Sequence, residues 1–165
     1  MKVELIDLQD KDYEIVKEIY DYYVSNSTVT FATEKPALSE LKETIFTGHP
    51  KYKSYLIITD SNICGFCYYS QYRKRQAYDR TAEVTIYLKP EFAGKGIGKQ
   101  TLEKLKTIAL EKGIAVLIGT ITAENLQSIR LFENCGFEKC AYFRQVGEKF
   151  NRLLDVVAYQ KILDI

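Results

Sequence analysis

Three glycines at alternate positions, Gly94, Gly96 and Gly98, are the feature that most constrains the fold of this 165-residue chain. An apolar, strand-like run at residues 84–88 precedes them, and an amphipathic helical pattern continues after them to about Lys112. Glycine lets backbone N–H groups approach an anion closely, and a helix start adds free donors and a positive dipole. A strand, a glycine loop and a helix start in this order predict a phosphate-binding site.

The spacing of the glycines excludes two common nucleotide-binding loops. A P-loop needs a glycine, four residues and then Gly-Lys-Ser/Thr, but Gln100 follows Lys99, and Ala93 stands at the position of the first glycine. A dinucleotide fingerprint needs Gly-x-Gly-x-x-Gly after the first strand of a domain. Here the third glycine comes one residue early and about 90 residues into the chain. The spacing leaves a structural turn open as the alternative to a phosphate loop.

Charge and hydropathy restrict the class of partner. Lys and Arg total 23, Asp and Glu total 22, and the formal net charge is +1. This balance argues against a protein that binds nucleic acid or an anionic membrane surface. We find no apolar run long enough to span a bilayer, and the alternating N-terminus lacks the apolar block of a signal peptide. The sequence therefore predicts a cytoplasmic protein with one domain over residues 1–165.

The four cysteines are Cys64, Cys67, Cys135 and Cys140. The first two have the two-residue spacer of a zinc knuckle or a redox pair, but they lie in an aromatic, strand-like run at residues 63–69. A zinc knuckle needs a tight turn there, and a thioredoxin motif opens a helix. We therefore expect buried, reduced thiols and no metal site.

Hydrophobic periodicity predicts a mixed α/β fold. Strands are expected at residues 4–8, 55–59, 63–72, 81–88, 115–122, 137–146 and 153–162, and helices at 12–24, 40–46, after the glycine loop and at 125–134. Gly113 is expected to end the third helix, and a turn is expected around Gly147. Because antiparallel hairpins surround two strand–helix–strand units, the sheet should be mixed and not a doubly wound parallel sheet.

Two segments together resemble a known superfamily. The loop at residues 93–98 resembles the pyrophosphate loop of the Gcn5-related N-acetyltransferases, usually Gln/Arg-x-x-Gly-x-Gly/Ala. About 30 residues later, residues 125–137 resemble the second acetyl-CoA segment of that superfamily. Residues 26–31, 75–78, 81–88 and 155–160 are similar to the phosphinothricin and methionine sulfone/sulfoximine N-acetyltransferases, so the resemblance spans nearly the whole chain.

The resemblance implies a mostly antiparallel, twisted sheet of about seven strands with about four flanking helices. It also implies acetyl-CoA as cosubstrate, a small-molecule amine as acceptor and a homodimer. The residues expected to bind the cofactor are backbone groups of Ile86, Tyr87 and Leu88, the loop residues Gly94, Lys95, Gly96, Ile97, Gly98 and Lys99, and Asn125.

Glu83 is the candidate general base, since it lies on a strand whose end approaches the acetyl group in this superfamily. A carboxylate in an aromatic setting has a raised pKa and can accept a proton from the amine, directly or through water. A backbone N–H near Leu88 is the expected oxyanion donor. The residues alone favour the alternative, an ordinary strand glutamate that faces solvent, and it is the resemblance that favours the base.

Arg75 and Tyr78 resemble the pocket in the subgroup for the acidic groups of the acceptor, and a guanidinium matches a carboxylate or phosphinate at two points. Phe31, with the hydroxyls of Thr28 and Thr30, is expected to form the opposite wall. The alternative is that Arg75 belongs to a solvated basic loop.

The chain departs from the family pattern at several positions. Ala93 replaces the Gln or Arg that opens the loop motif, and Phe132 stands where many members carry a tyrosine proposed as general acid. Asn151 and Leu153 replace a frequent Gly and the usual Trp. The leading hypothesis is an N-acetyltransferase of a small amino acid or amino-acid analogue, acting by direct transfer. The alternatives are acetylation of peptide N-termini or other small amines, and a domain that binds acetyl-CoA without catalysis.

Overall fold

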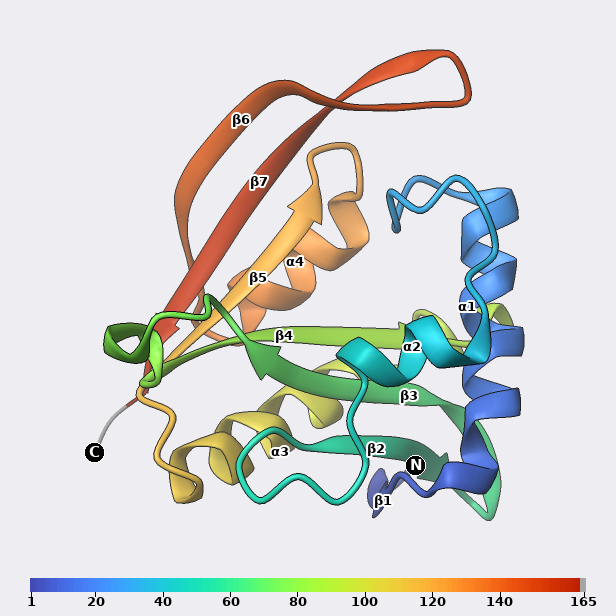
Figure 1. Cartoon of the computed structure of the whole chain (residues 1–165), viewed down its shortest axis with the longest axis vertical. Helices are drawn as coiled ribbons and strands as arrows, with labels where there is room; N and C mark the ends of the chain where they lie inside the picture. The colour runs from blue at the N-terminus through green and yellow to red at the C-terminus, as the bar shows by residue number, and fades with distance from the viewer. Residues whose placement is uncertain (164–165) are drawn as a thin grey trace.

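A computed structural model describes residues 1–163 and shows a seven-stranded sheet in the order β1-β2-β3-β4-β5-β7-β6 (Figure 1). The strands are β1 (Glu4–Asp7), β2 (Ser54–Thr59), β3 (Asn62–Gln71), β4 (Thr81–Leu88), β5 (Val116–Thr122), β6 (Glu138–Lys149) and β7 (Arg152–Ile162). Strands β4 and β5 are the parallel pair, and the other neighbouring strands run antiparallel. The predicted mixed, mostly antiparallel sheet is therefore confirmed.

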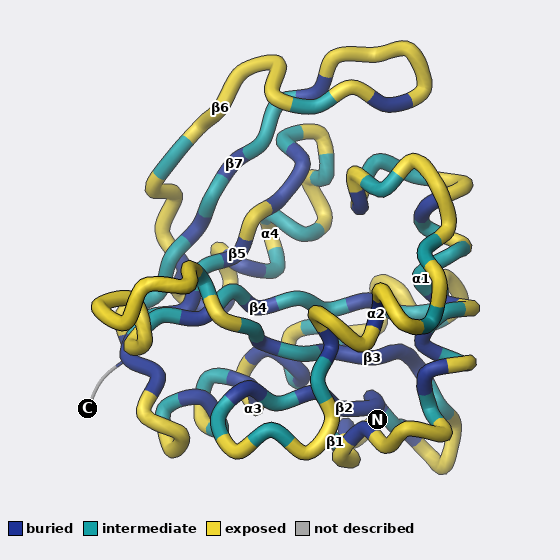
Figure 2. The backbone as a smooth tube through the Cα atoms, viewed as in Figure 1, coloured by how far each residue is buried: buried dark blue, intermediate teal, exposed yellow. Residues whose placement is uncertain are grey.

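Four α-helices cover the two faces of this sheet. Helices α1 (Tyr13–Asn26) and α2 (Leu38–Thr44) pack on one face, and α3 (Ile97–Glu111) and α4 (Leu126–Asn134) pack on the other. Burial is densest along β2 and β3, whereas β6 and the tip of the β6–β7 hairpin are largely exposed (Figure 2). Over residues 1–163, no helix is both long enough and apolar enough to cross a membrane.

The sheet opens between its two central strands. Only three Cα pairs join β4 to β5, from Thr81–Val116 to Glu83–Ile118, and beyond them the two strands diverge (Figure 1). The chain between β4 and β5 forms the glycine loop and α3, so the loop lies at the end of the opening where β4 finishes. This divergence positions the candidate site.

The β6–β7 hairpin differs from its prediction. Strand β6 continues to Lys149, which pairs with Arg152, and the two-residue turn consists of Phe150 and Asn151, both at positive φ (53° and 57°). The predicted turn at Gly147 is wrong, because Gly147 lies within β6 at the end of a register shift that begins at Phe143. Position 147 requires glycine because the Phe31 ring packs against its backbone. A Cβ atom at this position would lie 2.3 Å from Phe31 Cε2.

The cysteines are all free thiols. Cys64, Cys67 and Cys135 are buried, as expected, and burial raises the pKa of the Cys67 thiol. The expectation is wrong for Cys140, which is exposed because it lies on the outer strand β6. Within residues 1–163, no group of three His, Cys, Asp or Glu side chains is arranged to hold a metal ion.

We expect Gly65→Ala to lower the free energy of unfolding by about 2 kcal/mol or more, because backbone atoms cannot move aside as a flexible side chain can. A Cβ atom at Gly65 on β3 would lie 2.1 Å from the Tyr87 carbonyl oxygen on β4. Urea unfolding followed by circular dichroism measures the change. Ser70→Ala, on the same strand, is the control and should change stability by less than about 0.5 kcal/mol. Equal stability of the two variants would contradict the close approach of β3 and β4.

Candidate active site

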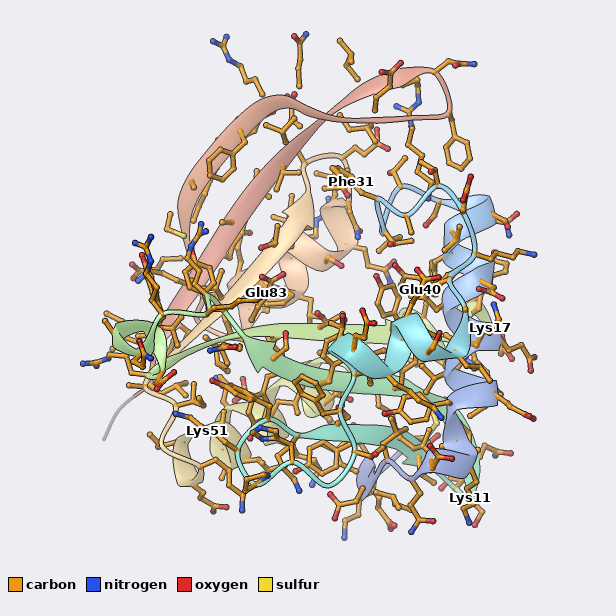
Figure 3. The ribbon with its side chains drawn as sticks, in the orientation of Figure 1. Lys11, Lys17, Phe31, Glu40, Lys51 and Glu83 are labelled. Carbon is orange, nitrogen blue, oxygen red and sulfur yellow. The ribbon has the colours of Figure 1, made fainter. Side chains whose placement is uncertain are left out.

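A cavity of about 730 Å³ occupies the opening between β4 and β5. Its walls come from α1, the segment after α1, β3, β4, the glycine loop with the start of α3, β5, α4 and β7. Glu83 lies on β4 near the point where the strands part, and Phe31 lies on the segment after α1 (Figure 3). The predicted site residues that line this cavity are Phe31, Glu83, Ile86, Tyr87, Leu88, Gly94, Gly96, Gly98, Lys99 and Asn125.

Four predicted site residues are not among those that line the cavity. Lys95 is exposed, with its Nζ atom 5.7 Å from the centre of the Phe92 ring, and the Ile97 side chain is fully buried in the core. Arg75 and Tyr78 are exposed on the loop between β3 and β4. A single chain therefore does not bring Arg75 and Tyr78 to Glu83, and their role as acceptor contacts stays a prediction.

The backbone of β4 offers hydrogen-bonding groups to the cavity. The Lys89 N–H donates to the Cys64 carbonyl at 2.8 Å, so the antiparallel pattern turns the N–H and C=O of Tyr87 toward β3. By the same alternation, the backbone groups of Ile86 and Leu88 face the side from which β5 has diverged. The hydroxyl of Tyr23 donates to the Leu88 carbonyl from that side. Ile86 and Leu88 therefore present backbone groups to a ligand, whereas Tyr87 presents its ring.

The glycine loop has the geometry of an anion site. Gly94 and Gly96 have φ values of 74° and 80°, a left-handed conformation that side chains other than glycine rarely adopt. Gly96 caps α3, so the N–H groups of the first helical turn, from Ile97 to Lys99, have no carbonyl within the helix to bond. These donors, the helix dipole and the Lys99 side chain fit a pyrophosphate.

Glu83 on β4 supplies a carboxylate to the cavity, apart from the glycine loop. Burial raises its pKa above the ordinary value, and a hydrogen bond with the Thr120 side chain on β5 opposes this effect. A carboxylate with a raised pKa is a better proton acceptor than an exposed glutamate while it remains ionised near neutral pH. Glu83 is therefore partly buried in the cavity wall and is not a fully exposed strand residue. Its role as the base stays a prediction.

Three tyrosines that line the cavity were missed as site residues: Tyr20 and Tyr23 on α1, and Tyr68 on β3. The Tyr20 hydroxyl lies 2.7 Å from Thr30 Oγ1, and burial raises the pKa of Tyr68 to about 12. Tyr20 and Tyr23 are partly buried on the face of α1 that packs on the sheet. The signal that could have identified them is the hydroxyl, since a tyrosine on an apolar helix face usually borders a polar space.

Helix α4 forms the remaining wall. Asn125 caps this helix, because its side-chain oxygen accepts from the Ser128 N–H at 3.2 Å, and it also lines the cavity. The Phe132 ring lies so close to Gly119 that a Cβ atom there would be 2.3 Å from Phe132 Cε1. At the position where a tyrosine hydroxyl is common in the superfamily, the wall is therefore an apolar ring.

The chain is similar to known acetyltransferases in sequence and in structure. The sequence profile of the acetyltransferase (GNAT) family matches residues 12–137. A phosphinothricin N-acetyltransferase of Streptomyces coelicolor is 30% identical, over 93% of this chain and 92% of its own. An L-methionine sulfoximine/L-methionine sulfone acetyltransferase of Pseudomonas paraeruginosa is 29% identical, over 99% and 96% of the two chains.

Among solved structures, a phosphinothricin acetyltransferase from Sinorhizobium meliloti in complex with acetyl-CoA superposes with a TM-score of 0.91. It is 30% identical, and the match covers 99% of this chain and 89% of that one.

Proposed function

The chain belongs to the acetyltransferase (GNAT) family, and on that premise we propose that it transfers an acetyl group from acetyl-CoA to the amino group of a small amino acid or amino-acid analogue. The observation that carries this proposal is that one cavity is lined both by the glycine loop, through Gly94, Gly96, Gly98 and Lys99, and by the partly buried carboxylate of Glu83. The relatives that act on phosphinothricin and methionine sulfoximine support the choice of acceptor.

Each part of the cavity has a role in the proposed direct transfer. The N–H groups of the loop and Lys99 hold the pyrophosphate of the cofactor, and the backbone of Ile86 pairs with its pantetheine arm as an added strand would. Glu83 accepts a proton from the acceptor ammonium, directly or through water, and thereby frees the nitrogen lone pair for attack on the thioester. The Leu88 N–H donates to the oxygen that gains negative charge in the transition state.

The acceptor occupies the space beside Glu83. Tyr20, Tyr68 and Thr30 surround this space with aromatic rings and hydroxyls, which suits a small acceptor with a partly apolar body. Arg75 and Tyr78 remain proposed contacts for its acidic group. A cytoplasmic location also remains a prediction.

Replacement of Glu83 by Gln is expected to lower turnover at least about tenfold, because the amide cannot accept the proton. Affinity for acetyl-CoA should change little, since the two side chains have nearly the same shape. In the wild type, kcat/KM should fall as the pH drops through the raised pKa of Glu83, because protonation removes the base. That acidic limb should be missing in the variant.

The measurements are steady-state kinetics from pH 5 to pH 9 and calorimetry with acetyl-CoA. Glu111→Gln, on the exposed end of α3, is the control variant and should behave as the wild type. Unchanged turnover of the Glu83 variant at neutral pH would show that Glu83 is not the base.

The function itself is tested by an acceptor screen with detection of the free thiol released from acetyl-CoA. We expect phosphinothricin, methionine sulfone or a free amino acid to have a kcat/KM at least about tenfold above that of short peptides and polyamines, a difference of about 1.4 kcal/mol in transition-state stabilisation. The physical reason is that the cavity beside Glu83 is walled on several sides and suits a small acceptor. A peptide or polyamine as the best acceptor would overturn the proposal.

We also propose that the protein is a homodimer that associates through the β6–β7 hairpin. Six large apolar side chains on this hairpin have exposed fractions between 47% and 62%, namely Tyr142, Phe143, Val146, Phe150, Leu153 and Ile162. Strand β6 is also the last strand of the sheet, so its outer edge is open to pairing. A set of exposed apolar side chains on one element is typical of an association surface.

Analytical ultracentrifugation at micromolar concentration is expected to give the mass of two chains. Phe143→Lys should shift the protein to one chain, because it places a charge within the proposed interface. Tyr22→Lys is the control, since Tyr22 is similarly exposed but lies on α1. A wild type with the mass of one chain would contradict the proposal.

A further inference from the structure

The segment at residues 27–31 forms part of the cavity wall without belonging to a helix or strand. It follows α1 and contributes Val29, Thr30 and Phe31 to the cavity. Since short loops without regular backbone pairing are intrinsically mobile, something else must hold this wall in place.

Lys149 supplies a buried cation at this segment. It is the last residue of β6 and is only 4% exposed. Its Nζ atom donates to the carbonyl of Ser27 at 2.7 Å and to the carbonyl of Thr30 at 2.9 Å. Within residues 1–163, it forms no ion pair with a carboxylate at 4.0 Å or less. The ammonium of Lys149 therefore contacts two carbonyls of one short backbone segment, and the centre of the Phe150 ring lies 5.1 Å from its Nζ atom.

Other contacts come from the same side of the opening. The Thr122 hydroxyl on β5 donates to the Thr28 carbonyl at 2.5 Å, and the Phe31 ring packs on Gly147 of β6. Helix α1, from which the segment continues, packs against β3 and β4. The segment therefore bridges the two halves of the divided sheet, and Lys149 and Thr122 are its buried attachments to the second half, Lys149 with a charged donor.

We propose that Lys149 is a positioning residue that fixes the acceptor-side wall of the cavity through the carbonyls of Ser27 and Thr30. The inference rests on the proposed function, because the wall matters only if an acceptor binds beside it. Lys149 does not line the cavity, so it acts through Thr30 and Phe31 and not on the reacting atoms. Its loss should impair acceptor binding and leave the cofactor end unchanged.

The first test compares Lys149→Met with the wild type. Methionine keeps most of the length of the side chain and removes the charged donor. The KM for the best acceptor should rise about tenfold, as loss of hydrogen bonds to a charged group predicts. The kcat and the KM for acetyl-CoA should stay within about twofold, whereas general misfolding would lower kcat and leave both KM values unchanged. Lys139→Met, an exposed lysine of the same strand, is the matched control and should leave all three constants unchanged.

The second test needs no acceptor. Hydrogen–deuterium exchange of residues 28–32 should be at least about tenfold faster in Lys149→Met, with no change in α3, because the released segment opens more often. An unchanged exchange rate and an unchanged acceptor KM would overturn the role of Lys149 while the proposed function stands. Failure of the wild type to acetylate any acceptor would instead overturn the proposed function, and the exchange experiment would still decide whether Lys149 holds the segment.

A rescue experiment separates the ammonium from the rest of the side chain. Lys149→Cys in a Cys140→Ser background is treated with bromoethylamine, which forms a C–S bond with loss of bromide and restores an ammonium at nearly the original length. Position 149 is only 4% exposed, so burial protects its thiol as it protects those of Cys64, Cys67 and Cys135. These three cysteines are therefore also replaced by alanine, and the chain is modified while unfolded in urea and then refolded. Modification should return the acceptor KM and the exchange rate to within about threefold of the wild type. If modification does not restore the acceptor KM and the exchange rate, the proposal is overturned. This test compares modified with unmodified Lys149→Cys, so it does not require Lys149→Met to fold.

Discussion

The divergence of β4 and β5 after three paired residues is the constraint on which the rest of the structure depends. Backbone groups that leave a sheet ladder need other partners, because an unpaired polar group in a dry interior is costly. Here the groups of Ile86 and Leu88 face a cavity that water or a ligand can fill. The same divergence leaves two half-sheets, β1–β4 and β5–β7, whose relative position needs contacts other than strand pairing. The contacts of Lys149 and Thr122 with the segment after α1 supply part of that connection.

Charge is distributed unevenly along the cavity. Among the described lining residues, Glu83 is the one carboxylate, whereas the cations Lys99 and Arg130 belong to α3 and α4. The free N–H groups of α3 add to the positive end. In the proposed function, the pyrophosphate of acetyl-CoA binds at this positive end and the thioester lies near Glu83. The separation of Glu83 from the cations Lys99 and Arg130 therefore gives the proposed ligand one orientation in the cavity.

The parts of the site that depend on local sequence were predictable. The strand that carries Glu83, the glycine loop and the helix at residues 125–134 follow from hydrophobic periodicity and from glycine, which are local features of the sequence. The contacts of Lys149 were not predictable, because Ser27 is 122 residues away in the sequence. The hairpin turn was misplaced for a related reason: Gly147 serves the Phe31 ring, a tertiary contact, and not a turn.

The apolar ring of Phe132 bears on how the proposed transfer handles protons. A thiol has an ordinary pKa of about 8.5, so a thiolate can leave at neutral pH without a strong acid beside it. An amino group with a pKa of about 8 or higher is mostly protonated at pH 7 and cannot attack until it loses that proton. The need for a base therefore exceeds the need for an acid. Phe132 fills the acid position with a ring that cannot donate, while Glu83 retains a carboxylate whose pKa is raised by burial. In the proposed reaction, the essential proton step is removal from the acceptor, and the wall formed by residues 27–31 matters because it keeps that acceptor beside Glu83.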